Sequence, residues 1–129
     1  MIYNHRYVSL EVLKLLIKKK WFVETIKGVI SAHLPVYYTK PRSDKHFFEC
    51  DAYYYPTQDQ VIDWLEQEHK IFISSFPLYD FNKINHPVTN KYGVDIKDEK
   101  GVEYGCQKNY KTKEEAINAA LLKVLKDFI

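Results

Sequence analysis

The side chains that could do metal or nucleophilic chemistry are few in this chain and widely separated. Cys50 and Cys106 have no partner at Cys-x-x-Cys spacing, and the nearest approach to a metal cluster is His46, Glu49, Cys50 and Asp51. His46 and Cys50 would share one face at i, i+4, but two side chains do not make a zinc site. The four glycines form no phosphate-binding loop, and no metalloprotease or nucleophile-elbow motif occurs. The sequence therefore predicts no metal, no cofactor and no enzymatic activity.

Aromatic residues are the outlier in the composition. They make up 16% of the chain, with 11 tyrosines, 7 phenylalanines and 2 tryptophans. In an extended run of tyrosines, alternate rings point away from the core, and an exposed ring gives a large contact area at little entropic cost. We therefore expect a protein-contact surface; packing over the edge of a small core and stacking on nucleic-acid bases are the alternatives. The candidate contact residues are Tyr37, Tyr38, Tyr53, Tyr54 and Tyr55.

Length and charge restrict the class of protein. The 129 residues carry 19 Lys and Arg against 17 Asp and Glu, which gives a net charge of +2, and 46% are hydrophobic. These values fit one domain that builds its own core. So small a net charge gives little general attraction to nucleic acid or anionic lipid, and no apolar run approaches the ~20 residues of a membrane helix. Isolated cysteines and the lack of a secretory signal pattern favour a cytoplasmic protein without membrane contact.

The N-terminal part of the chain is expected to hold a helix and a hairpin. Apolar residues at helical spacing predict a helix over 10–20, with Ser9 as its N-cap. Residues 21–30 fit either a second short helix or irregular structure. Two β-favouring runs, 36–39 and 47–50, flank a segment of turn-forming residues, which favours a hairpin.

The central part of the chain predicts a helix, a strand and a loop. A Thr-x-x-Gln capping box over 57–60 starts a helix predicted over 58–69. A strand follows over 71–75, and we expect Pro77 to end it because proline cannot donate to a β-ladder. Residues 77–91 are rich in Pro, Asp and Asn and predict a long exposed loop. Long loops in small domains are often functional, so this loop is a second candidate contact site.

The clearest hairpin pattern lies near the C-terminus. Residues 92–97 and 102–106 alternate at period two around a turn at 98–101, where Gly101 can supply a positive φ. This alternation predicts that the hairpin buries Val94 and Ile96, with Val102, Tyr104 and Cys106 across from them.

A final helix is predicted over 113–127, behind a second capping box formed by Thr112 and Glu115. Its apolar residues recur at i, i+3, i+4 and i+7, which indicates one buried stripe. The stripe consists of Ala116, Ile117, Ala120, Leu121, Val124, Leu125 and Phe128.

The order of elements from residue 58 onward, α-β-β-β-α, and the segment Thr112-Lys113-Glu114-Glu115-Ala116 together resemble a double-stranded-RNA-binding domain. In that family, a Lys-Lys-x-Ala-Lys motif at the start of the last helix holds phosphates. Here Lys113 keeps one of those lysines, while Glu114 and Glu115 place acids where phosphates would come. The resemblance implies the topology and, as an alternative function, nucleic-acid binding. The contact residues for that alternative are Lys108, Lys111 and Lys113.

A second resemblance extends over most of the chain. Residues 8–16, 55–58, 64–73 and 110–116 together are similar to small uncharacterised proteins of gut bacterial genomes and their prophages. The chain departs from that pattern after the first helix, where it reads Lys20-Trp21-Phe22. The resemblance implies a cytoplasmic accessory protein of a mobile element and no particular activity.

These observations predict an α+β fold, in which an antiparallel sheet of three or more strands has helices packed on one face. We expect a single domain over 1–129, with a helix and hairpin in 1–52 and the α-β-β-β-α order in 53–129. The expected function is a non-enzymatic interaction module with an unknown protein partner. Nucleic-acid binding on a degenerate double-stranded-RNA-binding scaffold is the alternative.

Overall fold

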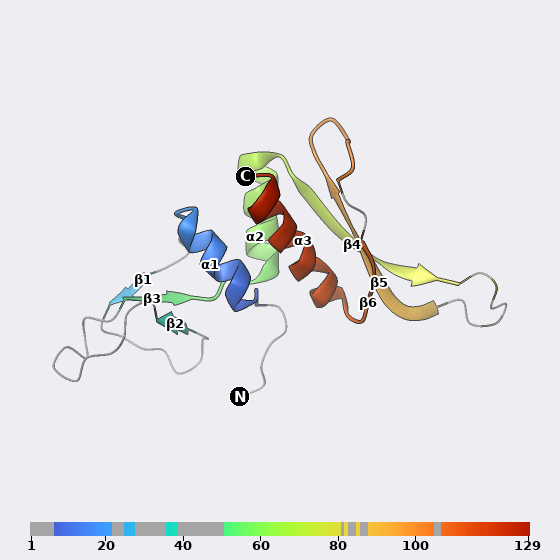
Figure 1. Ribbon diagram of the computed structural model, residues 1–129, viewed down its shortest axis with the longest axis horizontal. Coiled ribbons are helices and arrows are strands. Elements are labelled where there is room, and N and C mark those ends of the chain that lie inside the picture. Colours follow the sequence, from blue (N-terminus) through green and yellow to red (C-terminus); the bar gives the residue numbers. More distant parts are fainter. Residues whose placement is uncertain are drawn as a thin grey trace. The chain divides into compact units, whose positions relative to one another are not determined.

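The computed structural model describes residues 7–21, 25–27, 36–38, 51–80, 82, 85, 88–104 and 107–129. The chain divides into two units, Met1–Thr57 and Gln58–Ile129, and each contains helix and antiparallel strand (Figure 1). The prediction of an α+β fold is confirmed. Among the described helices, none has the length and apolar character that crossing a membrane requires.

The first unit begins with helix α1, Leu10–Lys18. Ser9 caps it as predicted, because its Oγ accepts a hydrogen bond from the Val12 N–H at 3.3 Å. The helix ends two residues before the predicted Lys20, which has a left-handed φ of 60°. Three apolar residues of the helix are buried: Val12, Leu13 and Leu16.

A small sheet follows in the same unit, with strands β1 (Thr25–Lys27), β2 (Val36–Tyr38) and β3 (Asp51–Tyr54) in the antiparallel order β1-β3-β2. The strand at Thr25–Lys27 replaces the helix or irregular structure expected there. The strand predicted over 36–39 is confirmed at 36–38, and in the structure it pairs with β3. The other predicted hairpin strand, 47–50, lies outside the described residues.

The second unit begins with helix α2, Gln58–Trp64, which continues as a π-helical turn η2, Leu65–His69. The predicted extent of 58–69 is therefore confirmed, although its last turn is wider than an α-helix. Lys70 ends it with a left-handed φ of 54° and donates its N–H to the Leu65 carbonyl. The buried Gln58 side chain donates from Nε2 to the Glu114 carbonyl at 2.8 Å. This bond ties the start of α2 to the first turn of the last helix.

The sheet of this unit has strands β4 (Phe72–Tyr79), β5 (Val88–Lys97) and β6 (Gln107–Tyr110), antiparallel in the order β4-β5-β6. Its core face carries Ile73 opposite Ile96, and Val94 two residues along, all buried. Because side chains alternate across a strand, Phe72 and its even-numbered neighbours on β4 belong to the opposite face.

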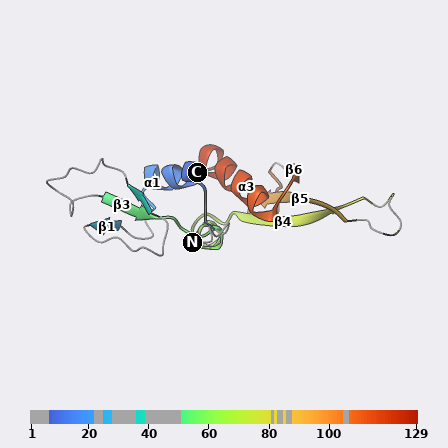
Figure 2. The ribbon, with the colours of Figure 1, turned by 90° about the horizontal axis from the view of Figure 1, so that it is seen from below.

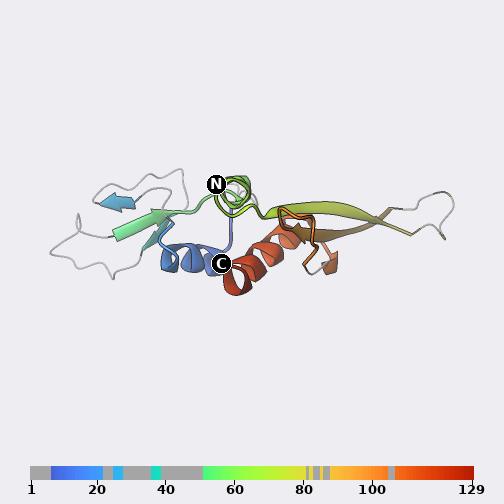
Figure 3. The ribbon, with the colours of Figure 1, turned by 90° about the horizontal axis from the view of Figure 1, so that it is seen from above.

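Helix α3, Lys113–Asp127, packs on the core face of the sheet. Figures 2 and 3 show it on one side of β4 and β5. The Thr112 cap is confirmed, because its side chain accepts from the Glu115 N–H at 3.0 Å. The predicted stripe is also confirmed at Ala116, Ile117, Ala120, Leu121, Val124 and Leu125, while Phe128 is half-buried.

The prediction that Pro77 ends the strand after α2 is wrong. Strand β4 continues through Pro77, which lies opposite Tyr92, as far as Tyr79. The connection is therefore 80–87 and not the predicted loop 77–91. The physical reason is that β4 is an edge strand, where a residue without an N–H costs no ladder hydrogen bond if its nitrogen faces outward.

The prediction of a strand over 102–106 is also wrong for the part that the structure describes. The two arms do pair beside the predicted turn, through the bridge between Lys97 and Glu103 and the bond from the Tyr104 N–H to the Ile96 carbonyl. The regular third strand, however, lies at Gln107–Tyr110. Val102 and Tyr104 are 48% and 37% exposed, so they do not join the core. Cys106 lies outside the described residues. Gly101 does supply the positive φ expected of the turn, at 78°.

Two asparagines mark irregularities of this sheet that the local alternation does not display. Asn90 and Asn109 have left-handed φ values of 60° and 76°, and each lies where the ladder of its strand shifts register. Asparagine adopts this conformation more readily than most residues, and an extra residue in a ladder makes a β-bulge. The alternation of residues along one strand does not show which residue of the next strand lies opposite once a bulge has shifted the register.

Replacing Thr112 with alanine tests the cap of α3. Thr112→Ala removes the acceptor for the Glu115 N–H, and we expect it to lower the free energy of unfolding by about 1 kcal/mol. Urea denaturation followed by circular dichroism measures the change. Thr112→Ser keeps the hydroxyl and should retain most of the stability; equal losses in the two variants would contradict the capping role.

Candidate functional site

The predicted tyrosine surface lies in the first unit. Strand register places Tyr37 directly opposite Tyr53, and the Lys14 ammonium lies 5.9 Å from the centroid of the Tyr37 ring. That distance is within the range of a cation–π contact. Tyr37, Tyr53, Tyr54 and Tyr55 are half-buried, and the Tyr38 side chain is outside the described residues. The structure thus brings Tyr37 and Tyr53 together, while Tyr54, the next residue in β3, belongs to the other face.

The lysines of the nucleic-acid alternative gather at the start of α3. Lys111 and Lys113 are exposed, and Lys108 lies in β6 with its side chain outside the described residues. Glu114 and Glu115 occupy the first turn of α3 between these lysines and the rest of the helix. Their negative charges interact favourably with the positive end of the helix dipole and oppose phosphate binding.

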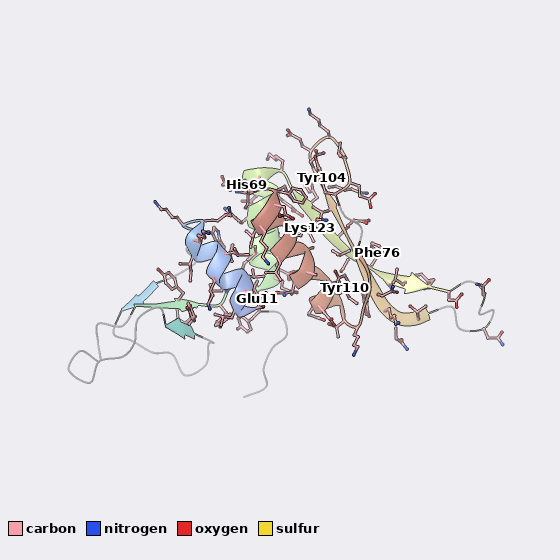
Figure 4. The ribbon with its side chains drawn as sticks, viewed as in Figure 1. Glu11, His69, Phe76, Tyr104, Tyr110 and Lys123 are labelled. Atoms are coloured by element: carbon pink, nitrogen blue, oxygen red, sulfur yellow. The ribbon has the colours of Figure 1, made fainter. Side chains whose placement is uncertain are left out.

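The pKa of Tyr110, beside these glutamates, is raised by its surroundings. Burial is the larger cause that raises the pKa of Tyr110, and the negative charge of Glu115 raises it further. Tyr110 lies on β6 beside the first turn of α3 (Figure 4). The shift indicates that the Glu115 carboxylate lies near Tyr110, at the start of the helix that Lys111 precedes.

Neither the metal-binding candidates nor the loop candidate forms a site among the described residues. Within those residues, no group of three or more His, Cys, Asp or Glu side chains could hold a metal ion. His46, Glu49 and Cys50 lie outside them. Of the connection 80–87, the structure describes Asp80, whose Oδ1 accepts from the Asn82 N–H at 3.1 Å, and Asn85. This turn is local and brings no other candidate residue to the loop.

A site that the sequence reasoning missed is the outer edge of β4. Strand β4 lies at one end of the sheet, and no strand of the described residues pairs with its outer side. All of its residues, Phe72 to Tyr79, are uncharged in a chain of which 28% is charged. Phe72 and Tyr79 at its two ends are 42% and 50% exposed. The uncharged run was visible in the sequence, but its position at an edge was not.

Hydrogen bonds elsewhere in the sheet define which backbone groups of β4 face outward. The Ile96 carbonyl accepts from the Tyr104 N–H at 2.7 Å, so the polar groups of Ile96 point away from β4. Ile73 and Ile96 therefore form a non-hydrogen-bonded pair, and the N–H and carbonyl of Ile73 point to the outer edge. The even-numbered residues of β4 point the other way: the Leu78 carbonyl, for example, faces β5 and accepts from Thr89 Oγ1 at 2.9 Å.

By this alternation, the outer edge of β4 presents the N–H and carbonyl groups of Ile73 and Ser75, followed by the carbonyl of Pro77. The nitrogen of Pro77 also lies on the outer side, which is why the proline fits within the strand. We call these backbone groups of Ile73, Ser75 and Pro77 the β4 edge. It is a short row of hydrogen-bonding groups without a strand partner among the described residues.

The sheet face away from α3 flanks the β4 edge. On this face Phe72 lies opposite Lys97, Ser74 opposite Asp95, and Phe76 opposite Gly93. Phe76 is half-buried on β4, and Figure 4 labels it there. The charges of this face therefore lie on β5, and the strand that borders the edge carries two phenylalanines separated by a serine.

Asp98 directly follows β5 and organises the turn after it. Its Oδ1 accepts from the Lys100 and Val102 N–H groups, both at 2.9 Å. Its Oδ2 accepts from the Tyr104 hydroxyl at 2.9 Å, and the Tyr104 ring lies 4.9 Å from that of Phe128 at the end of α3 (Figure 4). One carboxylate therefore holds the turn and a ring contact with the helix.

The hydrogen bonds of Asp98 change its pKa. Desolvation alone would raise the pKa of Asp98, but the bonds from Val102, Tyr104 and Lys100, together with the Lys100 charge, lower it below the ordinary 3.8. The same pair raises the pKa of Tyr104, first through the hydrogen bond to Asp98 and then through its negative charge. Both shifts favour the ionised carboxylate and the neutral phenol.

Asp98 should therefore make stability depend on acid pH. Its pKa is lower in the folded protein, so the contribution is present above the ordinary value of 3.8 and is lost as the pH falls through the folded pKa. We expect Asp98→Asn to be less stable than the natural protein at neutral pH, with the difference shrinking in acid, as measured by urea denaturation across pH. Glu99→Gln, on the exposed neighbouring carboxylate, is the control and should show no such pattern.

A carboxyl NMR titration gives a second measurement of the same network. The substitution Tyr104→Phe removes the hydroxyl that donates to Asp98, and it should raise the pKa of Asp98 toward its ordinary value. An unchanged Asp98 pKa in this variant would contradict the role of the Tyr104 hydrogen bond.

Comparison of the chain with protein-family models, with curated proteins and with solved structures gives no match.

Proposed function

We propose that this protein is a non-enzymatic interaction module that binds an extended segment of a protein partner by adding it as a strand to the β4 edge. One observation carries the proposal: the outer groups of Ile73 and Ser75 form a hydrogen-bonding row on a strand without a charged side chain. Natural proteins usually protect such edges with charges, prolines or bulges. Strand β4 has no charge, and its proline, Pro77, and the register shift beside it lie after Ile73 and Ser75. Strand addition uses main-chain hydrogen bonds for affinity and alternate side chains for specificity.

The surroundings of the β4 edge support a protein segment as the ligand. An incoming strand would meet Phe72 and Phe76 on the face away from α3, and both rings offer apolar contact area. Nucleic-acid binding has weaker support, because Glu114 and Glu115 accompany the exposed Lys113 and phosphate contacts supply most nucleic-acid affinity. The tyrosine surface of the first unit remains a predicted second contact site.

The proposed setting is that of a cytoplasmic accessory protein of a mobile element. Its support is the resemblance of the sequence to small proteins of gut bacterial genomes and prophages, and the isolated Cys50 and Cys106. An accessory protein that acts by binding needs a recognition surface and no reaction centre.

Selection from a displayed library of random peptides tests the proposal. We expect the immobilised protein to enrich peptides with β-branched and aromatic residues and without proline, because a strand must donate its N–H groups to the β4 edge. The variant Phe72→Glu should lose at least tenfold in affinity for these peptides. The new carboxylate would lie opposite Lys97, so the fold of the unit should tolerate it.

Val102→Glu is the matched control for that experiment. Val102 is 48% exposed against 42% for Phe72, and both substitutions replace an exposed apolar side chain with a negative charge. Only Phe72 borders the β4 edge, so Val102→Glu should leave peptide binding unchanged. Equal losses in the two variants would contradict strand addition at β4. Salt-sensitive binding of duplex RNA that is lost on Lys111→Glu and Lys113→Glu would instead favour the nucleic-acid alternative.

A further inference from the structure

We infer that the β4 edge pairs with the β4 edge of a second copy of this chain, in an antiparallel register centred on Ser74. The inference rests on the proposed strand addition and names its partner. It follows from three properties of β4: the direction of its outward groups, the position of Pro77, and the placement of two phenylalanines about Ser74.

The backbone groups restrict the register of such a pair. Two identical antiparallel strands bond through outward residues, which on β4 are Ile73, Ser75 and Pro77. With Ser74 at the two-fold axis, Ile73 faces Ser75 of the other copy and Ser75 faces Ile73. Each of these pairs can exchange both N–H···O bonds, which gives about four hydrogen bonds in all.

Neighbouring registers form a similar number of bonds but leave a carbonyl of Ile73 or Ser75 without a donor. A register centred on Ser75 would pair Ile73 with Pro77, and Pro77 has no N–H to donate. A register centred on Ile73 would pair Ser75 with Ile71, whose N–H already donates to the Leu65 carbonyl at 3.1 Å. The Ser74 register is therefore the one in which the N–H and the carbonyl of both Ile73 and Ser75 find a partner, on an edge that no other strand of the described residues occupies.

The side chains favour the same register. On the face away from α3, Phe72 of one copy lies opposite Phe76 of the other, and the two serines lie opposite each other. Aromatic cross-strand pairs stabilise antiparallel ladders. The pairing would cover Phe72, which is 42% exposed in the single chain. No charge opposes another between Phe72 and Phe76, because that stretch is uncharged.

A second copy fits this edge better than an unrelated segment because the edge is complementary to itself. The two-fold axis supplies each outward N–H with a carbonyl and each phenylalanine with a phenylalanine, which is the condition for an isologous interface. A partner of another sequence would have to bring the same pattern of groups.

Disulfide trapping tests the register directly. In the proposed pair, Ser74 and its symmetry mate form a non-hydrogen-bonded pair, with Cα atoms about 4.5 Å apart, which suits a disulfide. In a background with Cys50→Ser and Cys106→Ser, we expect Ser74→Cys to give a covalent dimer under oxidised glutathione. Phe76→Cys is the control on the same face, because Phe76 lies opposite Phe72 in this register and should cross-link at least tenfold more slowly.

Light scattering of the natural chain over a concentration series gives the second readout. We expect a concentration-dependent dimer that Phe72→Glu weakens at least tenfold and Val102→Glu leaves unchanged. A natural chain that stays monomeric, or faster cross-linking of Phe76→Cys than of Ser74→Cys, would overturn the inference. Selection of strand-like peptides by a monomeric chain would overturn the self-pairing alone and leave strand addition standing. A dimer insensitive to Phe72→Glu would also overturn the self-pairing alone, because its interface would lie elsewhere. Failure to select any strand-like peptide would contradict strand addition itself.

Discussion

The burial of one helix stripe against one sheet face is the constraint on which the C-terminal unit depends. Leu121 and Leu125 of α3 and Ile96 of β5 are almost fully buried, and each such side chain contributes about 1.5–3 kcal/mol through its removal from water. A one-residue slip of a strand would turn its core residues outward, so this burial fixes the register. It thereby also fixes which backbone groups of β4 point to the outer edge.

The proposed recognition surface is a consequence of that constraint. Ile73 must face α3 for its side chain to be buried, and the hydrogen bond to the Ile96 carbonyl then leaves the polar groups of Ile73 on the outside. The residues that face away from α3, Phe72 and Ser74 among them, are left to border the edge. Pro77, the one residue of β4 that resists pairing, limits the register of an added strand without blocking it.

Local signals predicted the helices well and the strands incompletely. The apolar spacing of α3 and the capping hydroxyls of Ser9 and Thr112 act within a few residues, so the sequence displays them. The prediction that Pro77 ends the strand is wrong because the tolerance of a proline depends on β4 being at the edge, which is a property of the whole sheet. The regular third strand likewise lies beyond the predicted 102–106, and its ladder with β5 shifts register at Asn109, which the local alternation does not display. The β4 edge was missed for the same reason: edge position is not a local property.

Amide hydrogen exchange of β4, measured residue by residue at rising protein concentration, tests the central claim most directly. The Phe72 and Ser74 amides point toward β5 and should be protected at every concentration. The Ile73 and Ser75 amides form the outer edge, so they should exchange rapidly in dilute protein and become protected as the protein is concentrated or a strand-forming peptide is added. Rapid exchange of Ile73 and Ser75 under all of these conditions would contradict recognition through the β4 edge.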